Sequence, residues 1–245
     1  MASSQNYGIS NYECTNYRNS GIGYGLASFY LKANASVFGI SRRHNQELDT
    51  FPNFLFLSLD LSNYELVKEE LPVFLQDVDF FDLAILNAGI LGKVNDLRKT
   101  TLSEIDRVMN TNVWANKVVI DLLFENVKKI NQIVAISSIA SISGNRGWNA
   151  YALSKTSLNM LIKMYAKEYP DTHFCSLAPG IIDTAIQDYI SALPEDDRFP
   201  TILRMKELKG TGKMPDPVHA APMLARAFKK VLQFESGSYL DVREL

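Results

Sequence analysis

The chain has 245 residues, of which 47% are hydrophobic and 21% charged, and its formal net charge is −2. This composition is ordinary for a globular protein with a large core. The scattered Lys and Arg argue against a nucleic-acid partner, and no apolar stretch approaches the ~20 residues of a membrane span. The N-terminus has no secretory signal pattern. Two cysteines, Cys14 and Cys175, do not suggest a disulfide framework, so we expect a cytoplasmic protein.

Strand-like runs alternate with helical patterns from residue 21 onward. The predicted strands are 36–40, 54–59, 83–86, 133–136, 174–177 and 238–242. The predicted helices are one from Gly21, one at about 63–76, one at about 102–127 with a break near Asn112, one at about 150–168 and one at about 217–232. Between them, about 183–214 reads as an irregular segment with one short helix.

Short apolar strands that alternate with helices are typical of a parallel sheet with helices on both faces. No repeat, low-complexity stretch or linker interrupts the pattern. The sequence therefore predicts an α/β protein, with residues 1–245 forming a single doubly wound domain of the Rossmann type.

Small or polar residues follow several of the predicted strands. They are Ser41-Arg42-Arg43, Asp60, Asn87-Ala88-Gly89, Ser138 and Pro179-Gly180. In such a sheet the carboxyl ends of the strands meet at one edge, where ligands bind. We therefore expect a ligand site there. The three histidines lack metal-ligand spacing, so no metal is expected in it.

The stretch from Ser137 to Lys155 carries the clearest chemical pattern. Tyr151 and Lys155 are four residues apart, which places them on one face of a helix. A neighbouring ammonium favours the phenolate, and a serine at the end of the preceding strand can hold a substrate oxygen. The spacing alone is weak, because Tyr64 and Lys68 share it where an exposed helix face is expected. With Ser138 it outlines a site for carbonyl reduction.

Taken together, the motifs make the chain resemble the short-chain dehydrogenase/reductase family over about residues 20–245. Within the family, the chain is most similar to carbonyl reductases of the sepiapterin-reductase and benzil-reductase kinds. Ser138 stands thirteen residues before Tyr151, the separation that the family uses. The motifs that carry the resemblance are Gly21-Ile22-Gly23, Asp60, Asn87-Ala88-Gly89, Asn112, Ser138, Tyr151-Ala152-Leu153-Ser154-Lys155 and Pro179-Gly180-Ile181-Ile182-Asp183-Thr184.

The resemblance implies a catalytic role for four residues. Tyr151 would protonate the carbonyl oxygen as hydride arrives from the nicotinamide. Lys155 would favour the phenolate and hydrogen-bond the nicotinamide ribose, and Ser138 would position the substrate oxygen. Asn112 would interrupt its helix and hold a water that links Lys155 to solvent; the alternative is an amide on the helix surface.

The resemblance also implies a cofactor site. Gly21, Ile22 and Gly23 would receive the pyrophosphate at the start of a helix. The remaining contacts would come from Asp60 and Leu61 at the adenine, Asn87, Ala88 and Gly89 at the adenosine ribose, Tyr151 and Lys155 at the nicotinamide ribose, and Pro179, Gly180, Ile182 and Thr184 around the nicotinamide.

The residues after the second predicted strand bear on the choice of cofactor. A carboxylate there would accept hydrogen bonds from a free 2′-hydroxyl and repel a 2′-phosphate. The chain instead has Ser41, Arg42 and Arg43, and a guanidinium offers bidentate contact to phosphate. The alternative is two solvated arginines. NADP(H) is favoured over NAD(H).

The substrate pocket is less determined by the sequence. Trp148, Ile139, Leu91, Ile181 and residues of 183–214 are expected to line it, which suggests an apolar or aromatic carbonyl compound; the aromatic residues could equally be core. The segment 183–214, and within it 192–200, is expected to form a mobile substrate lid. We expect a homodimer or homotetramer that pairs the helices at about 102–127 and 150–168, by resemblance to the family.

The chain departs from the family's pattern near its N-terminus. Counting back from Gly21, Asn16-Tyr17 stands where the family has a Thr-Gly turn, and residues 9–14 are too polar for a buried central strand. Three explanations are open: a sequence error, a rebuilt strand, or loss of dinucleotide binding. The last would make the chain a catalytically silent binding or regulatory protein of the same fold, the alternative to an NADPH-dependent reductase.

Overall fold

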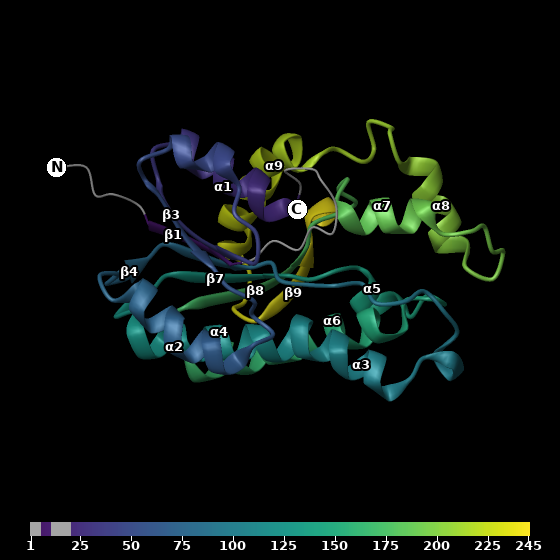
Figure 1. The fold of residues 1–245 in the computed structure, drawn as a ribbon, viewed down its shortest axis with the longest axis horizontal. Coiled ribbons are helices and arrows are strands. Elements are labelled where there is room, and N and C mark those ends of the chain that lie inside the picture. The colour runs from purple at the N-terminus through teal and green to yellow at the C-terminus, as the bar shows by residue number, and fades with distance from the viewer. Residues whose placement is uncertain (1–5, 11–20) are drawn as a thin grey trace.

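A parallel sheet forms the centre of the computed structural model, which describes residues 6–10 and 21–245 (Figure 1). Within these residues seven strands run in the order β3-β2-β1-β5-β7-β8-β9, and every pair is parallel. The strands are β1 Asn6–Ser10, β2 Ser36–Ser41, β3 Phe54–Ser58, β5 Leu83–Leu86, β7 Gln132–Ile136, β8 His173–Ala178 and β9 Ser238–Asp241. A separate parallel pair joins β4 Phe80–Phe81 to β6 Lys129–Ile130.

Helices cover both faces of the sheet (Figure 1). One layer holds α1 Ile22–Lys32 and α9 Pro217–Lys230; the other holds α2 Tyr64–Leu75, α4 Ala115–Asn126 and α6 Asn149–Glu168. The remaining helices of the described residues are α3 Leu102–Met109, α5 Ala140–Ser143, α7 Ala185–Ala192, α8 Pro200–Leu208, the π-helical turn Asn110–Trp114 and the 3₁₀ turns Gln46–Thr50, Leu97–Lys99, Val231–Gln233 and Val242–Glu244. The doubly wound α/β fold predicted from the sequence is confirmed.

The central strands supply side chains to both cores. On β7, Ile133 and Ala135 pack in the core under α2, α4 and α6, whereas Val134 packs in the core under α1 and α9. Successive side chains of a strand point to opposite faces, so a strand covered on both sides needs apolar residues throughout. This requirement explains the continuous apolar runs in the sequence.

The first strand lies earlier in the chain than the motif count indicated. It covers Asn6–Ser10, between β2 and β5, and so begins before residue 9; residues 11–14 lie outside the described residues. A strand is defined by backbone pairing with its neighbours, which counting back from a glycine motif does not detect. The expected departure at Asn16-Tyr17 lies outside the described residues.

The segment 183–214 differs from the prediction of one short helix, because it holds α7 and α8. Pro200 is at the first position of α8, where its missing N–H leaves no intrahelical bond unmade. Ile190, Phe199 and Ile202 from this segment pack with Trp148 and Leu91 in a third apolar cluster. The two helices lie together at one end of the sheet (Figure 1).

A close helix contact depends on Gly25 of α1. A Cβ atom built on Gly25 would stand 2.1 Å from the carbonyl oxygen of Pro217, the first residue of α9. Any side chain at position 25 would therefore force the two helices apart. Among the helices of the described residues, none is long and apolar enough to cross a membrane.

Candidate active site

A cavity of about 330 Å³ opens at the carboxyl end of the sheet. Its wall passes from Gly21 and Ile22, at the start of α1, to the ends of β5 and β7 and then to α7 and α8. The predicted site residues that line it are Gly21, Ile22, Asn87, Gly89, Ser138, Tyr151, Lys155, Pro179, Gly180, Ile182 and Thr184, with Ile139, Trp148 and Ile181 among those expected at the substrate. Gly23, Ser41, Arg42, Arg43, Asp60, Leu61, Ala88, Leu91 and Asn112 lie outside its wall.

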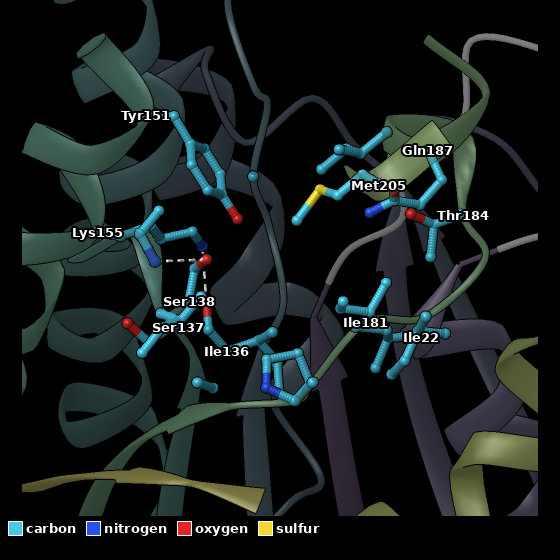
Figure 2. A pocket seen from close by; sticks show the side chains of 18 of the residues that line it. Ile22, Ile136, Ser137, Ser138, Tyr151, Lys155, Ile181, Thr184, Gln187 and Met205 are labelled. Carbon is cyan, nitrogen blue, oxygen red and sulfur yellow. Dashed lines mark hydrogen bonds between the residues drawn. The ribbon is translucent and has the colours of Figure 1, made fainter. Parts of the chain in front are cut away.

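Tyr151 and Lys155 stand one turn apart on α6, with the phenol directed into the cavity (Figure 2). Lys155 is only 3% exposed, and its Nζ atom lies 5.7 Å from the centre of the Tyr151 ring. The same Nζ donates a 2.7 Å hydrogen bond to the carbonyl oxygen of Ile136 at the end of β7. The helix and the strand are thereby joined at the site.

Burial shifts both titrating groups toward their neutral forms. It lowers the pKa of Lys155 from 10.5 to about 8. It raises the pKa of Tyr151, and a side-chain hydrogen bond with Ser138 opposes this shift only in part. Burial thus outweighs the effect that the sequence led us to expect from the neighbouring ammonium. The phenol holds its proton at neutral pH.

A hydrogen-bond network fixes Ser138 between β7 and α5. The Ser138 Oγ accepts from the Ala140 N–H at 3.1 Å, and its carbonyl accepts from the Ser141 hydroxyl at 2.7 Å. Asn159 of α6 completes the network, because its amide donates to Ser141 at 2.9 Å and accepts from Ser137 at 2.6 Å. Sequence reasoning missed Asn159, although its position one turn after Lys155 was a signal.

Asn112 lies in a π-helical turn, Asn110–Trp114, which interrupts the helix between α3 and α4. Its side chain is fully buried: Oδ1 accepts from the Ile90 N–H at 2.7 Å, and Nδ2 donates to the Ile90 carbonyl and the Ser154 hydroxyl, both at 2.9 Å. A Cβ atom on Gly89 would stand 3.2 Å from Lys155 Nζ. Asn112 therefore holds the loop after β5 against α6, which the sequence did not predict.

The residues at the start of α1 fit the phosphates of a dinucleotide. Gly21, the N-cap residue, has φ 147°, a conformation that favours glycine. Among the described residues, no side chain caps this helix and no acidic residue lies in its first turn, and Gly21 and Ile22 line the cavity, so the N–H groups of the first turn are suited to an anion there. Gly180, with φ 79°, also lines the cavity and brings no side chain into it.

The arginines expected at the adenosine end lie at the end of β2. Arg42 and Arg43 are exposed, and an Arg42 nitrogen lies 3.8 Å from Asp60 Oδ2. Burial alone would raise the pKa of Asp60, but hydrogen bonds from Ser62 and the charge of Arg42 lower it overall. Leu61 is buried in the core, so only its backbone can reach a ligand.

Several contacts join the segment of α7 and α8 to the loop before α6. Trp148 Nε1 donates to the Thr201 hydroxyl at 3.1 Å. A Cβ atom on Gly147, whose φ is 96°, would stand 2.8 Å from the Phe199 ring. Asp96 accepts from Arg146 at 2.6 Å and from Arg198 at 3.0 Å. These contacts join residues far apart in the sequence, so no local sequence pattern could predict them.

The fold and this site define a nucleotide-binding α/β oxidoreductase. The model of the family described as short chain dehydrogenase matches residues 18–194. The chain therefore belongs to the short-chain dehydrogenase family, whose members bind a nicotinamide dinucleotide.

Curated relatives and solved structures agree with this assignment. A benzil reductase ((S)-benzoin forming) of Bacillus cereus is 27% identical over 91% of this chain and 96% of its own. A sepiapterin reductase of Meriones unguiculatus is 29% identical over 65% of this chain and 62% of its own. A short chain dehydrogenase/reductase from Saccharomyces cerevisiae shares the fold with a TM-score of 0.81 at 19% identity, covering 98% of this chain and 96% of that one.

Proposed function

We propose that the protein reduces a ketone or diketone carbonyl to an alcohol with NADPH, and that Tyr151 donates the proton. One observation carries the proposal. The Tyr151 phenol stands beside the buried Lys155 and hydrogen-bonds Ser138, in the wall of a cavity that continues to the N-terminus of α1. An acid (Tyr151), a cation (Lys155) and a hydroxyl that can bind the substrate oxygen (Ser138) thus surround the same part of the cavity.

The chain's own residues account for the proton chemistry. NADPH, when bound, supplies the hydride to the carbonyl carbon. Ser138 would hold the carbonyl oxygen by a hydrogen bond, and Tyr151 would give that oxygen its proton as negative charge develops. Because burial raises the pKa of the phenol, Tyr151 carries this proton at neutral pH. Lys155, charged below its pKa of about 8, would stabilise the phenolate left behind.

The preference for NADPH is supported by charge at the end of β2. Ser41, the last residue of β2, is buried, and its hydroxyl donates to the Arg43 carbonyl at 2.6 Å. Because Arg42 and Arg43 come next, no carboxylate directly follows the strand. Arg42 and Arg43 are exposed next to it and are suited to a 2′-phosphate. Asp60 offsets part of this charge, through its contact with Arg42.

The residues that line the cavity support an apolar substrate. Ile139, Trp148, Ile181 and Met205 line the cavity, and the centre of the Trp148 ring lies 5.9 Å from the centre of the Tyr151 ring. Such a wall suits an aryl or alkyl ketone. The benzil reductase names among the relatives point to a diketone of this kind.

The experiment is a turnover assay with benzil. The purified protein should consume NADPH when benzil is added, and a single hydroxyketone should form in equal amount. NADH should support the reaction less well. Failure of the protein to bind NADPH, measured by fluorescence titration, would rule out the proposal and favour a silent member of the family.

A further inference from the structure

The segment that carries α7 and α8, residues 183–214, leaves and rejoins the rest of the protein at one point. The Asp183 N–H donates a 2.9 Å hydrogen bond to the Pro215 carbonyl, so the two ends of the segment lie side by side. Just before the return, a Cβ atom on Gly210 or Gly212 would meet no atom within 4 Å. Joined ends with open space beside them suit a hinge, because hinge residues absorb changes in φ and ψ.

Helices α7 and α8 are tied to each other inside this segment. Lys206 of α8 donates to the Leu193 carbonyl at the end of α7, and Lys209, just after α8, forms an ion pair with Asp188 of α7. Both helices also contribute apolar side chains to the cluster that contains Trp148. The two helices therefore form one unit.

The Asp96 carboxylate joins this unit to the body of the protein. Its Oδ1 accepts from Arg146 Nε at 2.6 Å, and its Oδ2 accepts from Arg198 Nη1 at 3.0 Å. Arg146 belongs to the loop before α6, and Arg198 to the loop between α7 and α8. Helix α7 has 8 residues, so it separates these ion pairs from the hinge by roughly 12 Å.

The ion pairs are adjacent to residues that line the cavity. Phe199, next to Arg198, is buried, and the guanidinium groups of Arg146 and Arg198 lie 5.9 Å and 5.1 Å from its ring centre. Trp148, two residues after Arg146, lines the cavity and donates to the Thr201 hydroxyl of α8, which lines it too. Separation of the ion pairs would therefore loosen the contact between Trp148 and α8.

We propose that Asp96 is a positioning residue for the reduction, which latches α7 and α8 as a hinged lid over the cavity. The inference rests on the proposed function. Asp96 lies outside the cavity wall, so it acts only through Arg146 and Arg198. When its ion pairs break, the lid opens at the hinge and Trp148 separates from Thr201. Substrate then enters and the alcohol leaves.

The energetics of exposed ion pairs suit a latch that opens during each turnover. One such pair contributes little, but here a single carboxylate serves two guanidinium groups. In Asp96→Asn both ion pairs are lost, and an amide N–H₂ group is placed against one guanidinium, where donor meets donor. We expect the ratio of open to closed lid to rise about threefold to tenfold.

The first measurement reports the lid without catalysis. In a Trp114→Phe background Trp148 is the only tryptophan, and it is 6% exposed. Quenching of its fluorescence by acrylamide, an uncharged quencher, measures how often it is exposed, with no ligand present. The matched control is Asp197→Asn, which removes an exposed acid next to Arg198 that makes no ion pair within the described residues.

Asp96→Asn should raise the quenching constant about threefold, and Asp197→Asn should leave it unchanged. With Asp96 present, NaCl at about 1 M should raise the constant as well, because the Debye length falls to about 3 Å. In Asp96→Asn this salt effect should be much smaller. An unchanged constant in Asp96→Asn, an equal rise in Asp197→Asn, or an equal salt effect with and without Asp96 would overturn the inference.

The second measurement separates KM from kcat for benzil. A lid that is open more often binds substrate more weakly and releases product sooner, so Asp96→Asn should raise KM about threefold to tenfold and leave kcat unchanged or higher. Asp96→Glu keeps the charge and should have a KM closer to the wild-type value. An unchanged KM in Asp96→Asn, a loss confined to kcat, or an Asp96→Glu as impaired as Asp96→Asn would contradict the latch.

The two measurements distinguish failure of the inference from failure of the proposed function. If benzil is not reduced but the quenching constant depends on Asp96 as described, the proposed reaction fails and the latch stands. If benzil is reduced and Asp96→Asn keeps the wild-type KM, the reverse holds. Thermal melting identifies a variant that fails to fold. If Asp96→Asn is such a variant, the salt dependence of Trp148 quenching with Asp96 present decides the outcome, because its absence would overturn the inference.

Discussion

Lys155 donates its 2.7 Å hydrogen bond to the main-chain carbonyl of Ile136, the last residue of β7. Ser137 and Ser138 follow Ile136 directly, and Tyr151 precedes Lys155 by one turn of α6. This single contact therefore sets the distance between the strand end that carries the serine and the helix that carries the tyrosine. The fold itself therefore positions Tyr151 relative to Ser138, as the proposed proton transfer requires, before any ligand binds.

Removal of the Tyr151 hydroxyl should separate catalysis from cofactor binding. In Tyr151→Phe we expect turnover of benzil to fall by about 10²-fold or more, because general acid catalysis is lost. NADPH affinity should change little, since the phenol supplies a proton but holds little of the cofactor. Steady-state rates and a fluorescence titration measure the two effects.

Tyr64→Phe is the matched control for Tyr151→Phe. Tyr64 has the same four-residue spacing to Lys68, but its hydroxyl donates to the Asn110 carbonyl and Lys68 pairs with Glu65 on the surface. Turnover should be retained in this variant. If Tyr151→Phe kept most of the wild-type turnover, Tyr151 would not be the proton donor.

The arginines after β2 should discriminate between the two cofactors. In the double variant Arg42→Ala, Arg43→Ala, NADPH should bind roughly tenfold to a hundredfold more weakly, because hydrogen bonds from charged groups to the 2′-phosphate are lost. NADH lacks that phosphate and should be little affected. Arg226→Ala, an exposed arginine on α9, controls for a general loss of positive charge. Equal weakening of both cofactors would show that Arg42 and Arg43 are only solvated.

Exposed apolar side chains on α6 support the expected oligomer. Leu153, Met160 and Met164 are 46%, 58% and 55% exposed, and their spacing of seven and four residues places them on one helix face. We expect a dimer, and Met160→Glu with Met164→Glu should shift it to monomer because charges would be buried at the interface. Light scattering gives the mass. A monomeric wild type at micromolar concentration would contradict the expectation.

The sequence revealed those parts of the site that recur as short patterns. The polar residues after the apolar runs, the break at Asn112 and the one-turn spacing of Tyr151 and Lys155 are all local, and the doubly wound fold follows from alternating strands and helices. The pattern could not show which way burial would move the pKa of Tyr151, because burial depends on the packing of the entire chain.

What the sequence did not reveal depends on contacts between distant segments. The hydrogen bonds of Asn159 join α6 to the turn after β7, and Gly25 is needed only because Pro217 lies against it. Helix α8 was missed because its apolar residues are recognisable as a buried face only once they pack in the cluster that contains Trp148. No periodicity within one segment carries such information.

The pKa of Lys155 predicts how stability changes with pH in the absence of cofactor. Burial lowers this pKa from 10.5 to about 8. Between those two values, the unfolded chain keeps a proton that folded Lys155 has lost. The contribution of Lys155 to the free energy of unfolding therefore rises with pH through this window, by at most about 3 kcal/mol. Below the folded pKa the buried ammonium is a constant penalty.

Lys155→Met should remove this dependence. We expect the difference in unfolding free energy between wild type and Lys155→Met to shift in favour of the wild type from about pH 7 to about pH 10, because only the wild type loses the penalty of a buried charge. Urea unfolding at several pH values measures it. Lys163→Met, which replaces an exposed lysine on the same helix, is the matched control for the loss of a lysine. A pH-independent difference for Lys155→Met would mean that folded Lys155 keeps its proton throughout, so that its stabilisation of the Tyr151 phenolate would persist at alkaline pH.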